Sequence, residues 1–128
     1  MRALVVEDIE INRVVMQMIL EQLGCDVSTA VDGQEGLGAI DVGQFDIVFM
    51  DLQMPVCDGF EATRQIRKIE IVEGRHRLPI FAVSANTSEK DRIMSSEVGM
   101  DGFIAKPVTI QILRDILGSI SVSGVPGV

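Results

Sequence analysis

The chain has 128 residues, with 11 Lys and Arg against 19 Asp and Glu, so its net charge is −8. This length suits one domain with its own hydrophobic core, and the negative charge argues against nucleic acid or an anionic membrane as a direct partner. No apolar run approaches the roughly 18 residues of a membrane span, and no signal peptide is recognisable. Cys25 and Cys57 fit neither a disulfide framework nor a metal site, so we expect reduced thiols and a cytoplasmic location.

The hydrophobic pattern predicts five short apolar strands that alternate with five helices. The expected strands are 3–6, 26–30, 46–51, 79–84 and 102–105. The expected helices run from Ile11 until Gly24 ends the first, and then over 34–42, 60–69, 89–98 and 110–120. Such alternation favours a doubly wound α/β domain, with a parallel sheet covered by helices on both faces. We expect a polar loop over 70–78, one domain over 1–120, and a flexible tail or the start of a linker over 121–128.

Asp51 follows the four apolar residues 47–50 in the expected strand 46–51, a short apolar run typical of a strand buried on both faces. Pro55 then excludes helix at the residue before it, and Asp58-Gly59 indicates a turn. Asp51 is therefore expected at the carboxyl end of a central strand. In an open parallel sheet this edge is where ligands bind.

Polar residues end three other expected strands in the same way. Glu7 and Asp8 follow the first strand, Ser84 ends the fourth, and Lys106 follows the fifth. Because parallel strands end at one edge of the sheet, we expect these side chains to gather around Asp51.

This set of side chains suits phosphoryl chemistry. Three carboxylates would raise one another's pKa unless a cation joined them, and oxygen ligands without His or Cys favour Mg²⁺, with Mn²⁺ as a substitute. The hydroxyl of Ser84 and the ammonium of Lys106 would complete a pocket for a tetrahedral dianion. The only nucleophile that such a pocket offers is a carboxylate.

The chain resembles the receiver domains of two-component response regulators over about residues 3–118. The matching motifs are Val5-Val6-Glu7-Asp8, Met50-Asp51-Leu52-Gln53-Met54-Pro55 with Asp58-Gly59, Val83-Ser84-Ala85, and Phe103-Ile104-Ala105-Lys106-Pro107. The longer sequence around these motifs is most similar to that of receivers attached to hybrid histidine kinases. The resemblance implies a flavodoxin-like (βα)5 fold with strand order 2-1-3-4-5.

The resemblance also implies a role for each acidic position. Asp51 would accept a phosphoryl group from phosphohistidine. Asp8 and Asp51 would bind Mg²⁺ directly, aided by the backbone carbonyl of Gln53, and Glu7 would act through water.

Further positions would hold and report the phosphoryl group. Lys106 and Ser84 would bind its oxygens, and the small Ala85 would let the loop close. Phe103 would be the switch aromatic, which turns inward when Ser84 moves. Phe103 stands where the family often has Tyr, so it can report only by packing, and Ser84 replaces the commoner Thr.

The implied partners are a histidine kinase or a histidine phosphotransfer protein. The implied output is a changed surface around 89–98, 102–105 and 110–120, which a covalently linked kinase or output domain could read. A phosphorylation-dependent dimer is left open. The domain would be a switch that catalyses only its own phosphorylation and dephosphorylation, rather than an enzyme.

Two alternatives belong to other classes. A haloacid dehalogenase-type phosphohydrolase needs an acid two residues after its nucleophile, where this chain has Gln53. An unphosphorylated pseudo-receiver would need none of the five polar residues at the strand ends. A flavodoxin that binds FMN is disfavoured because Asp8 and Glu10 lie where a phosphate loop needs Ser, Thr or Gly.

Overall fold

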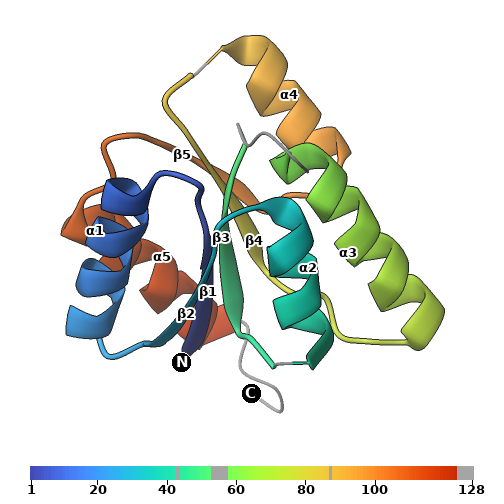
Figure 1. Ribbon diagram of the computed structural model, residues 1–128, viewed down its shortest axis with the longest axis horizontal. Helices are drawn as coiled ribbons and strands as arrows, with labels where there is room; N and C mark the ends of the chain where they lie inside the picture. Colours follow the sequence, from blue (N-terminus) through green and yellow to red (C-terminus); the bar gives the residue numbers. More distant parts are fainter. Residues whose placement is uncertain (43, 53–57, 87, 124–128) are drawn as a thin grey trace.

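The computed structural model describes residues 1–42, 44–52, 58–86 and 88–123. Its elements are β1 (Arg2–Val6), α1 (Glu10–Gln22), β2 (Asp26–Ala30), α2 (Gly33–Val42), β3 (Ile47–Asp51), α3 (Gly59–Glu73), β4 (Ile80–Ser84), α4 (Glu89–Glu97), β5 (Gly102–Ala105) and α5 (Ile110–Ser123). The strands form one parallel sheet in the order β2-β1-β3-β4-β5. This order and the doubly wound fold class confirm the prediction (Figure 1).

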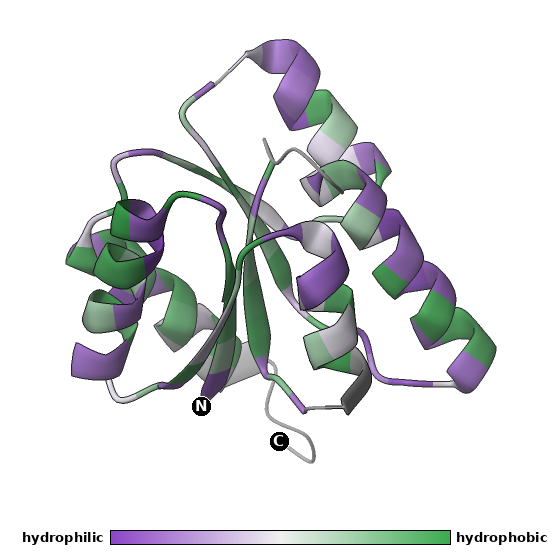
Figure 2. Ribbon diagram, viewed as in Figure 1, coloured by the Kyte–Doolittle hydropathy of each residue, from purple (hydrophilic) through white to green (hydrophobic). Residues whose placement is uncertain are grey.

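Helices cover both faces of the sheet, with α1 and α5 on one face and α2, α3 and α4 on the other (Figure 1). Successive residues of a strand point to opposite faces, so β3 contributes to two cores. Ile47 and Phe49 pack with α1 and α5, whereas Val48 and Met50 pack with α2 and α3. The central strands are hydrophobic along their length, as burial on both faces requires (Figure 2).

Helix α3 is one turn longer than the sequence predicted. The expected loop over 70–78 is wrong for its first four residues, because α3 continues to Glu73. Gly74 then ends the helix in the left-handed conformation, with φ of 65°, and the Arg75 N–H donates to the Glu70 carbonyl at 2.9 Å. This glycine cap sets the boundary, and a pattern based on apolar spacing does not register it.

Helix α5 also runs further than expected. Leu113 and Leu117 are buried as their spacing predicted, but the helix continues to Ser123, past position 121 where a tail was expected to begin. Residues 124–128 lie outside the described part, so the domain boundary stays a prediction. In the described ranges, no helix is both long and apolar enough to cross a membrane.

Helix α1 buries a different face from its most regular apolar stripe. Met16 and Leu20 are buried, whereas Ile11 and Met18 are 66% and 63% exposed. The helical spacing of apolar residues therefore predicted the helix correctly, but part of that apolar stripe lies on the surface.

The start of α3 lies against the end of β3. Asp58 caps the helix, because its side chain accepts a hydrogen bond from the Glu61 N–H at 2.9 Å. Gly59 follows at a place where a Cβ atom would collide with the Asp51 carbonyl oxygen. The Asp58-Gly59 pair thus brings the amino end of α3 close to Asp51.

Candidate functional site

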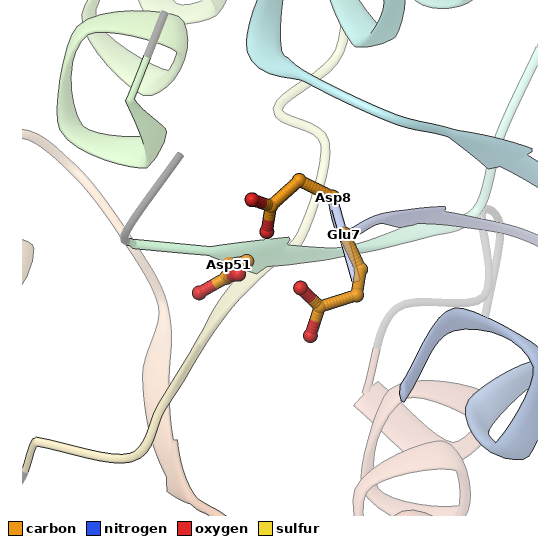
Figure 3. Close-up of side chains that lie close together, drawn as sticks. All are labelled: Glu7, Asp8 and Asp51. Atoms are coloured by element: carbon orange, nitrogen blue, oxygen red, sulfur yellow. The ribbon is translucent and has the colours of Figure 1, made fainter. Parts of the chain in front are cut away.

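Three carboxylates meet at the carboxyl end of the sheet. Glu7 and Asp8 follow β1, and Asp51 is the last residue of β3. The two strands are neighbours, with Val6 paired to Met50, so the side chains that follow them lie side by side. Each carboxylate offers an oxygen within 4.8 Å of the others, and the three groups point into one space (Figure 3). The structure therefore brings together the acidic residues that the sequence predicted.

The three carboxylates differ in their surroundings. Glu7 and Asp51 are 2% and 5% exposed, whereas Asp8 is more accessible. The Oδ1 atom of Asp8 is nonetheless buried and has no hydrogen-bond partner among the described residues. A buried carboxylate oxygen without a partner is costly, and a cation bound at this point would remove that cost.

Lys106 supplies the positive charge of the site. Its Nζ lies 2.7 Å from Glu7 Oε1 and 3.8 Å from Asp51 Oδ2. The lysine therefore contacts the carboxylates directly, and its shorter ion pair is with Glu7. The sequence placed Lys106 at this edge correctly but gave no indication of which acid it pairs with.

The pKa of Glu7 lies below its ordinary value. Burial, the largest influence, would raise the pKa. Hydrogen bonds with the side chains of Asp51 and Lys106 and with the backbone of Ile9, together with the positive charge of Lys106, outweigh it and lower the pKa. Glu7 therefore stays ionised although it is buried.

Sequence reasoning missed a contribution from Arg13. Its guanidinium donates to the Glu7 carbonyl oxygen at 3.0 Å, across one turn at the start of α1. The Ile9 N–H also donates to Glu7 Oε2, at 3.3 Å. These contacts fix the loop that carries both acids. A basic residue five positions after Asp8 at the start of a helix is the signal that could have suggested this role.

Ser84 lies at the edge as predicted, but its hydroxyl is engaged within its own loop. The Oγ donates to the Asn86 carbonyl oxygen at 2.9 Å and accepts from the Asn86 N–H at 3.0 Å. The residue is fully buried, whereas Ala85 beside it is exposed.

Phe103 lies half-buried on β5 and packs against the core formed with α2, α3 and α4. The guanidinium of Arg92, from α4, lies 4.7 Å from the centre of its ring. This cation–π contact links α4 to the predicted switch aromatic. Gln53, whose backbone carbonyl was predicted as a metal ligand, lies outside the described residues.

The donor set fits a hard divalent cation. Among the described residues it consists of the carboxylate oxygens of Glu7, Asp8 and Asp51, one of them buried without a partner there, and includes no His or Cys. Mg²⁺ uses one or two protein carboxylates and fills its other positions with water and phosphate oxygens. The cluster could therefore hold a metal ion, as the sequence predicted.

The family model of the response regulator receiver domain matches residues 3–118. The chain belongs to this family. The fold, the strand order and the acidic edge of this receiver domain all agree with that membership.

Hybrid kinases are among its curated relatives. The chain is 42% identical over 118 residues to hybrid signal transduction histidine kinase A of Dictyostelium discoideum, a match that covers 91% of the chain and 5% of the kinase. It is 40% identical over 116 residues to hybrid signal transduction histidine kinase E of the same organism, which covers 90% of the chain and 7% of the kinase. The receiver domain thus spans a small part of the relatives that it matches.

Solved receiver structures share its fold. The receiver domain of the sensor histidine kinase PA1611 from Pseudomonas aeruginosa, solved with magnesium in its active-site cleft, has a TM-score of 0.83 and 35% identity over 92% of this chain and 94% of that one. A chain of the co-crystal of the Saccharomyces cerevisiae phosphotransfer protein Ypd1 and the receiver domain of Ssk1 has a TM-score of 0.88 and 29% identity, over 94% and 90%.

Proposed function

We propose that this receiver domain accepts a phosphoryl group on Asp51 from the phosphohistidine of a histidine kinase or a histidine phosphotransfer protein. The observation that carries the proposal is the cluster of Glu7, Asp8 and Asp51 within 4.8 Å, with Lys106 beside it. Asp51 ends the central strand, so its carboxylate is held rigidly at the open edge of the sheet.

In the proposed step a carboxylate oxygen of Asp51 attacks the phosphorus of the donor. A P–O bond forms while the P–N bond to the donor imidazole breaks, and the electron pair stays on the imidazole nitrogen, which takes up a proton. Lys106, already 3.8 Å from Asp51, would follow the charge that develops on the phosphoryl oxygens.

Asp8 and Asp51 would hold Mg²⁺ directly, together with the backbone carbonyl of Gln53, and Glu7 would act through water. When bound, the ion supplies positive charge to the phosphoryl oxygens. Mn²⁺, which accepts the same oxygen ligands, is the natural substitute to test beside it. The orphaned Oδ1 of Asp8 is the atom that supports this assignment.

The change in the domain surface would start when the Ser84 hydroxyl exchanges its hydrogen-bond partner. Its hydroxyl would leave Asn86 and donate to a phosphoryl oxygen, and the exposed, small Ala85 would let the loop close. Phe103 would then repack, and its contact with Arg92 would transmit the change to α4. The surface of α4, β5 and α5 would differ between the two states.

The donor would bind on α1. The exposed apolar residues of this helix and its approach lie beside the site, and they are Ile9, Ile11, Val14, Val15 and Met18. A hollow of about 360 Å³ between α1 and the segment after β5 borders both Glu7 and Lys106. An apolar surface that adjoins the acceptor suits a protein donor, because it positions the phosphohistidine without adding negative charge.

The first prediction is that the domain gains one phosphoryl group when it is incubated with acetyl phosphate and Mg²⁺, and that Asp51→Asn abolishes the gain. Intact-mass spectrometry measures the addition directly. Asp115→Asn is the matched control, because Asp115 is an exposed acid on α5 that bonds only Gln111 among the described residues, and it should be phosphorylated as the parent is.

A mass gain that survives in Asp51→Asn would overturn the proposal. Absence of any gain with acetyl phosphate and with a phosphorylated protein donor would favour the pseudo-receiver. Continuous release of phosphate from many phosphomonoesters would favour the phosphohydrolase.

The second prediction separates the donor surface from the chemistry. Ile11→Ser combined with Met18→Ser should slow phosphotransfer from a protein donor, with phosphorylated Ypd1 as the probe, by about tenfold or more. Phosphorylation by acetyl phosphate should be unchanged, because this small donor needs no surface on α1. Equal loss with both donors would show that the substitutions damage the site itself, and no loss with either would place the donor elsewhere.

The wider context is also a proposal. Because the chain resembles a small part of hybrid kinases, a kinase or output domain on the same polypeptide is a natural partner. We propose a cytoplasmic switch that turns over only its own phosphoryl group. A phosphorylation-dependent dimer would use the surface of α4, β5 and α5.

A further inference from the structure

The carboxyl end of α3 exposes apolar side chains far from the acidic site. Ile71 is 82% exposed and Val72 is 76% exposed, the highest values among the large hydrophobic residues of the described part. Figure 2 shows this hydrophobic stretch near the end of α3. Residues so exposed and adjacent to each other indicate a contact surface rather than a core.

The same segment is basic within an acidic chain. Residues 64–77 hold five of the 11 Lys and Arg residues and the single His, but only two acids, so they carry a charge of +3 where the whole chain carries −8. When Glu61 and Asp101, which pair with Arg64, Arg67 and Arg77, are counted as well, this part of the surface keeps a charge of about +1, opposite in sign to that of the whole chain.

Basic and apolar side chains share one face of the helix. Lys68, Ile71 and Val72 are spaced at i, i+3 and i+4 on α3, and Arg75 follows directly after the cap. Arg75 pairs with Glu73 at 2.9 Å and keeps 36% of its side chain exposed. Lys68, Ile71, Val72, Arg75 and the nearby Arg77 are called the α3-end surface below.

A groove of about 590 Å³ adjoins this surface, between the end of α3 and the turn before β5. Ile71 and Val98 line it, together with Arg75 and Arg77. Arg77 pairs with Asp101 at 3.1 Å, yet its side chain is 59% exposed and available to a further acceptor.

The floor of the groove is rigid because Arg67 is held from several sides. Its guanidinium bonds the carboxylates of Glu70 and Asp101, each at 2.9 Å, and the carbonyl oxygens of Leu78 and Gly99, at 2.8 and 2.9 Å. The carboxylates that border the groove are therefore neutralised internally. The other side chains that line the groove, Ile71, Arg75, Arg77 and Val98, are apolar or positive.

We propose that the α3-end surface binds an acidic segment of a partner protein that carries apolar side chains between its Asp and Glu residues. Apolar side chains would cover Ile71 and Val72 and enter the groove, while carboxylates would meet Lys68, Arg75 and Arg77. A bilayer fits less well, because a flat surface cannot fill the groove and the chain's net charge opposes an anionic membrane.

This surface is separate from the acceptor site. Arg67 and its partners lie where β4 and β5 begin, at the opposite edge of the sheet from the three carboxylates. Binding there would leave the acidic edge and α1 open to the phosphodonor. The receiver domain could thus hold a partner and accept a phosphoryl group at the same time.

The test uses a fluorescein-labelled acidic peptide of about 18 residues, which spans five helical turns, with Leu at i, i+3, i+4 and i+7 and Glu and Ala elsewhere. We expect saturable binding by fluorescence anisotropy that weakens as salt is added. Ile71→Ser with Val72→Ser, and separately Lys68→Glu with Arg75→Glu, should each weaken binding at least about tenfold. Amide shift changes in the NMR spectrum should map to 67–78 and 98–99.

Ile93→Ser is the matched control, because it removes a 51% exposed apolar side chain from α4 and should leave binding unchanged. A scrambled peptide of the same composition should bind at least about tenfold more weakly. Equal binding by the parent and both α3 variants would overturn the proposal, as would shift changes confined to α1. Binding of the parent to vesicles of phosphatidylcholine and phosphatidylserine would also overturn the proposal if the α3 variants lost that binding. Self-association of the parent chain that the α3 variants lost would overturn it as well.

Discussion

Glu7 lies in the most crowded electrostatic position of the domain. It lies beside Asp51, pairs with Lys106 at 2.7 Å and accepts a hydrogen bond from the backbone N–H of Ile9. Burial alone would raise the pKa of Glu7, and these partners lower it below its ordinary value instead. The site therefore carries its negative charge before any metal binds.

The third prediction concerns the pH dependence of stability in metal-free protein. The pKa of Glu7 in the folded state lies below its ordinary value of 4.5, so its ionisation stabilises the fold above that value, and the stabilisation is lost as pH falls through the folded pKa. The free energy of unfolding of the parent, relative to Glu7→Gln, should therefore be higher at pH 7 than at pH 3.

Urea titrations in EDTA at both pH values measure this difference. Ile93→Ser, which changes no titratable group, is the control and should differ from the parent by the same amount at each pH. A difference between the parent and Glu7→Gln that does not change with pH would contradict the lowered pKa.

Individual site positions were predicted more reliably than their partners. Strand ends are local features of a sequence, so the acids at β1 and β3 and Lys106 after β5 could be placed from the order of residues alone. The closer pairing of Lys106 with Glu7 than with Asp51 depends on side-chain distances between the ends of β1, β3 and β5. Local sequence patterns do not contain those distances.

At the scale of elements, the junction of β3 and α3 is the tightest contact around the site. The fourth prediction is that Gly59→Ala lowers the free energy of unfolding by about 1–3 kcal/mol, because the added Cβ would collide with the Asp51 carbonyl oxygen. Gly38→Ala is the control, since Gly38 lies inside α2 with nothing within 4 Å of an added Cβ. It should raise stability by about 0.5–1 kcal/mol, as helix propensity favours alanine.

Denaturant unfolding of both variants measures the two effects. Stabilisation by Gly59→Ala would show that the end of β3 can move away from α3, and that Asp51 is held less firmly than the structure indicates.

Helices and strands were predicted well where the burial of apolar residues defines them. They were predicted less well where a helix cap sets the boundary. Strands β1, β3 and β4 follow from short apolar runs that the sheet buries along almost their whole length. The end of α3 depends instead on the left-handed glycine after Glu73, and the last turn, whose apolar Ile71 and Val72 are exposed, gave no core-facing periodic signal. In α1, apolar residues occur on both faces, so spacing alone could not tell the buried Leu20 from the exposed Met18.

Across the whole molecule, a network of charged side chains lies at each end of the sheet strands. Carboxylates dominate the edge where the strands end, and the Arg67 network closes the edge where β4 and β5 begin. That network joins α3 to the residues before both strands. The network therefore connects elements that are distant in sequence. Hydrogen bonds and ion pairs fix their relative positions more specifically than the hydrophobic contacts on each face would.

The fifth prediction is that Arg67→Met lowers the free energy of unfolding by about 3 kcal/mol, because it leaves Glu70 and Asp101 without their shared cation. Arg64→Met is the control and should cost less than about 0.5 kcal/mol, since its pair with Glu61 is half exposed. Urea unfolding at pH 7 measures both. Similar costs for the two variants would show that the network adds no more than a surface ion pair.

The hydroxyl of Ser84 already has an acceptor and a donor, both from Asn86. A phosphoryl group that recruits this hydroxyl therefore gains only the difference between two hydrogen bonds, which is far less than the strength of either one. The resting contacts with Asn86 therefore compete with any acceptor that the Ser84 hydroxyl is offered. If Ser84 acts as we propose, an anion that is not a stronger acceptor than the Asn86 carbonyl would leave these contacts in place.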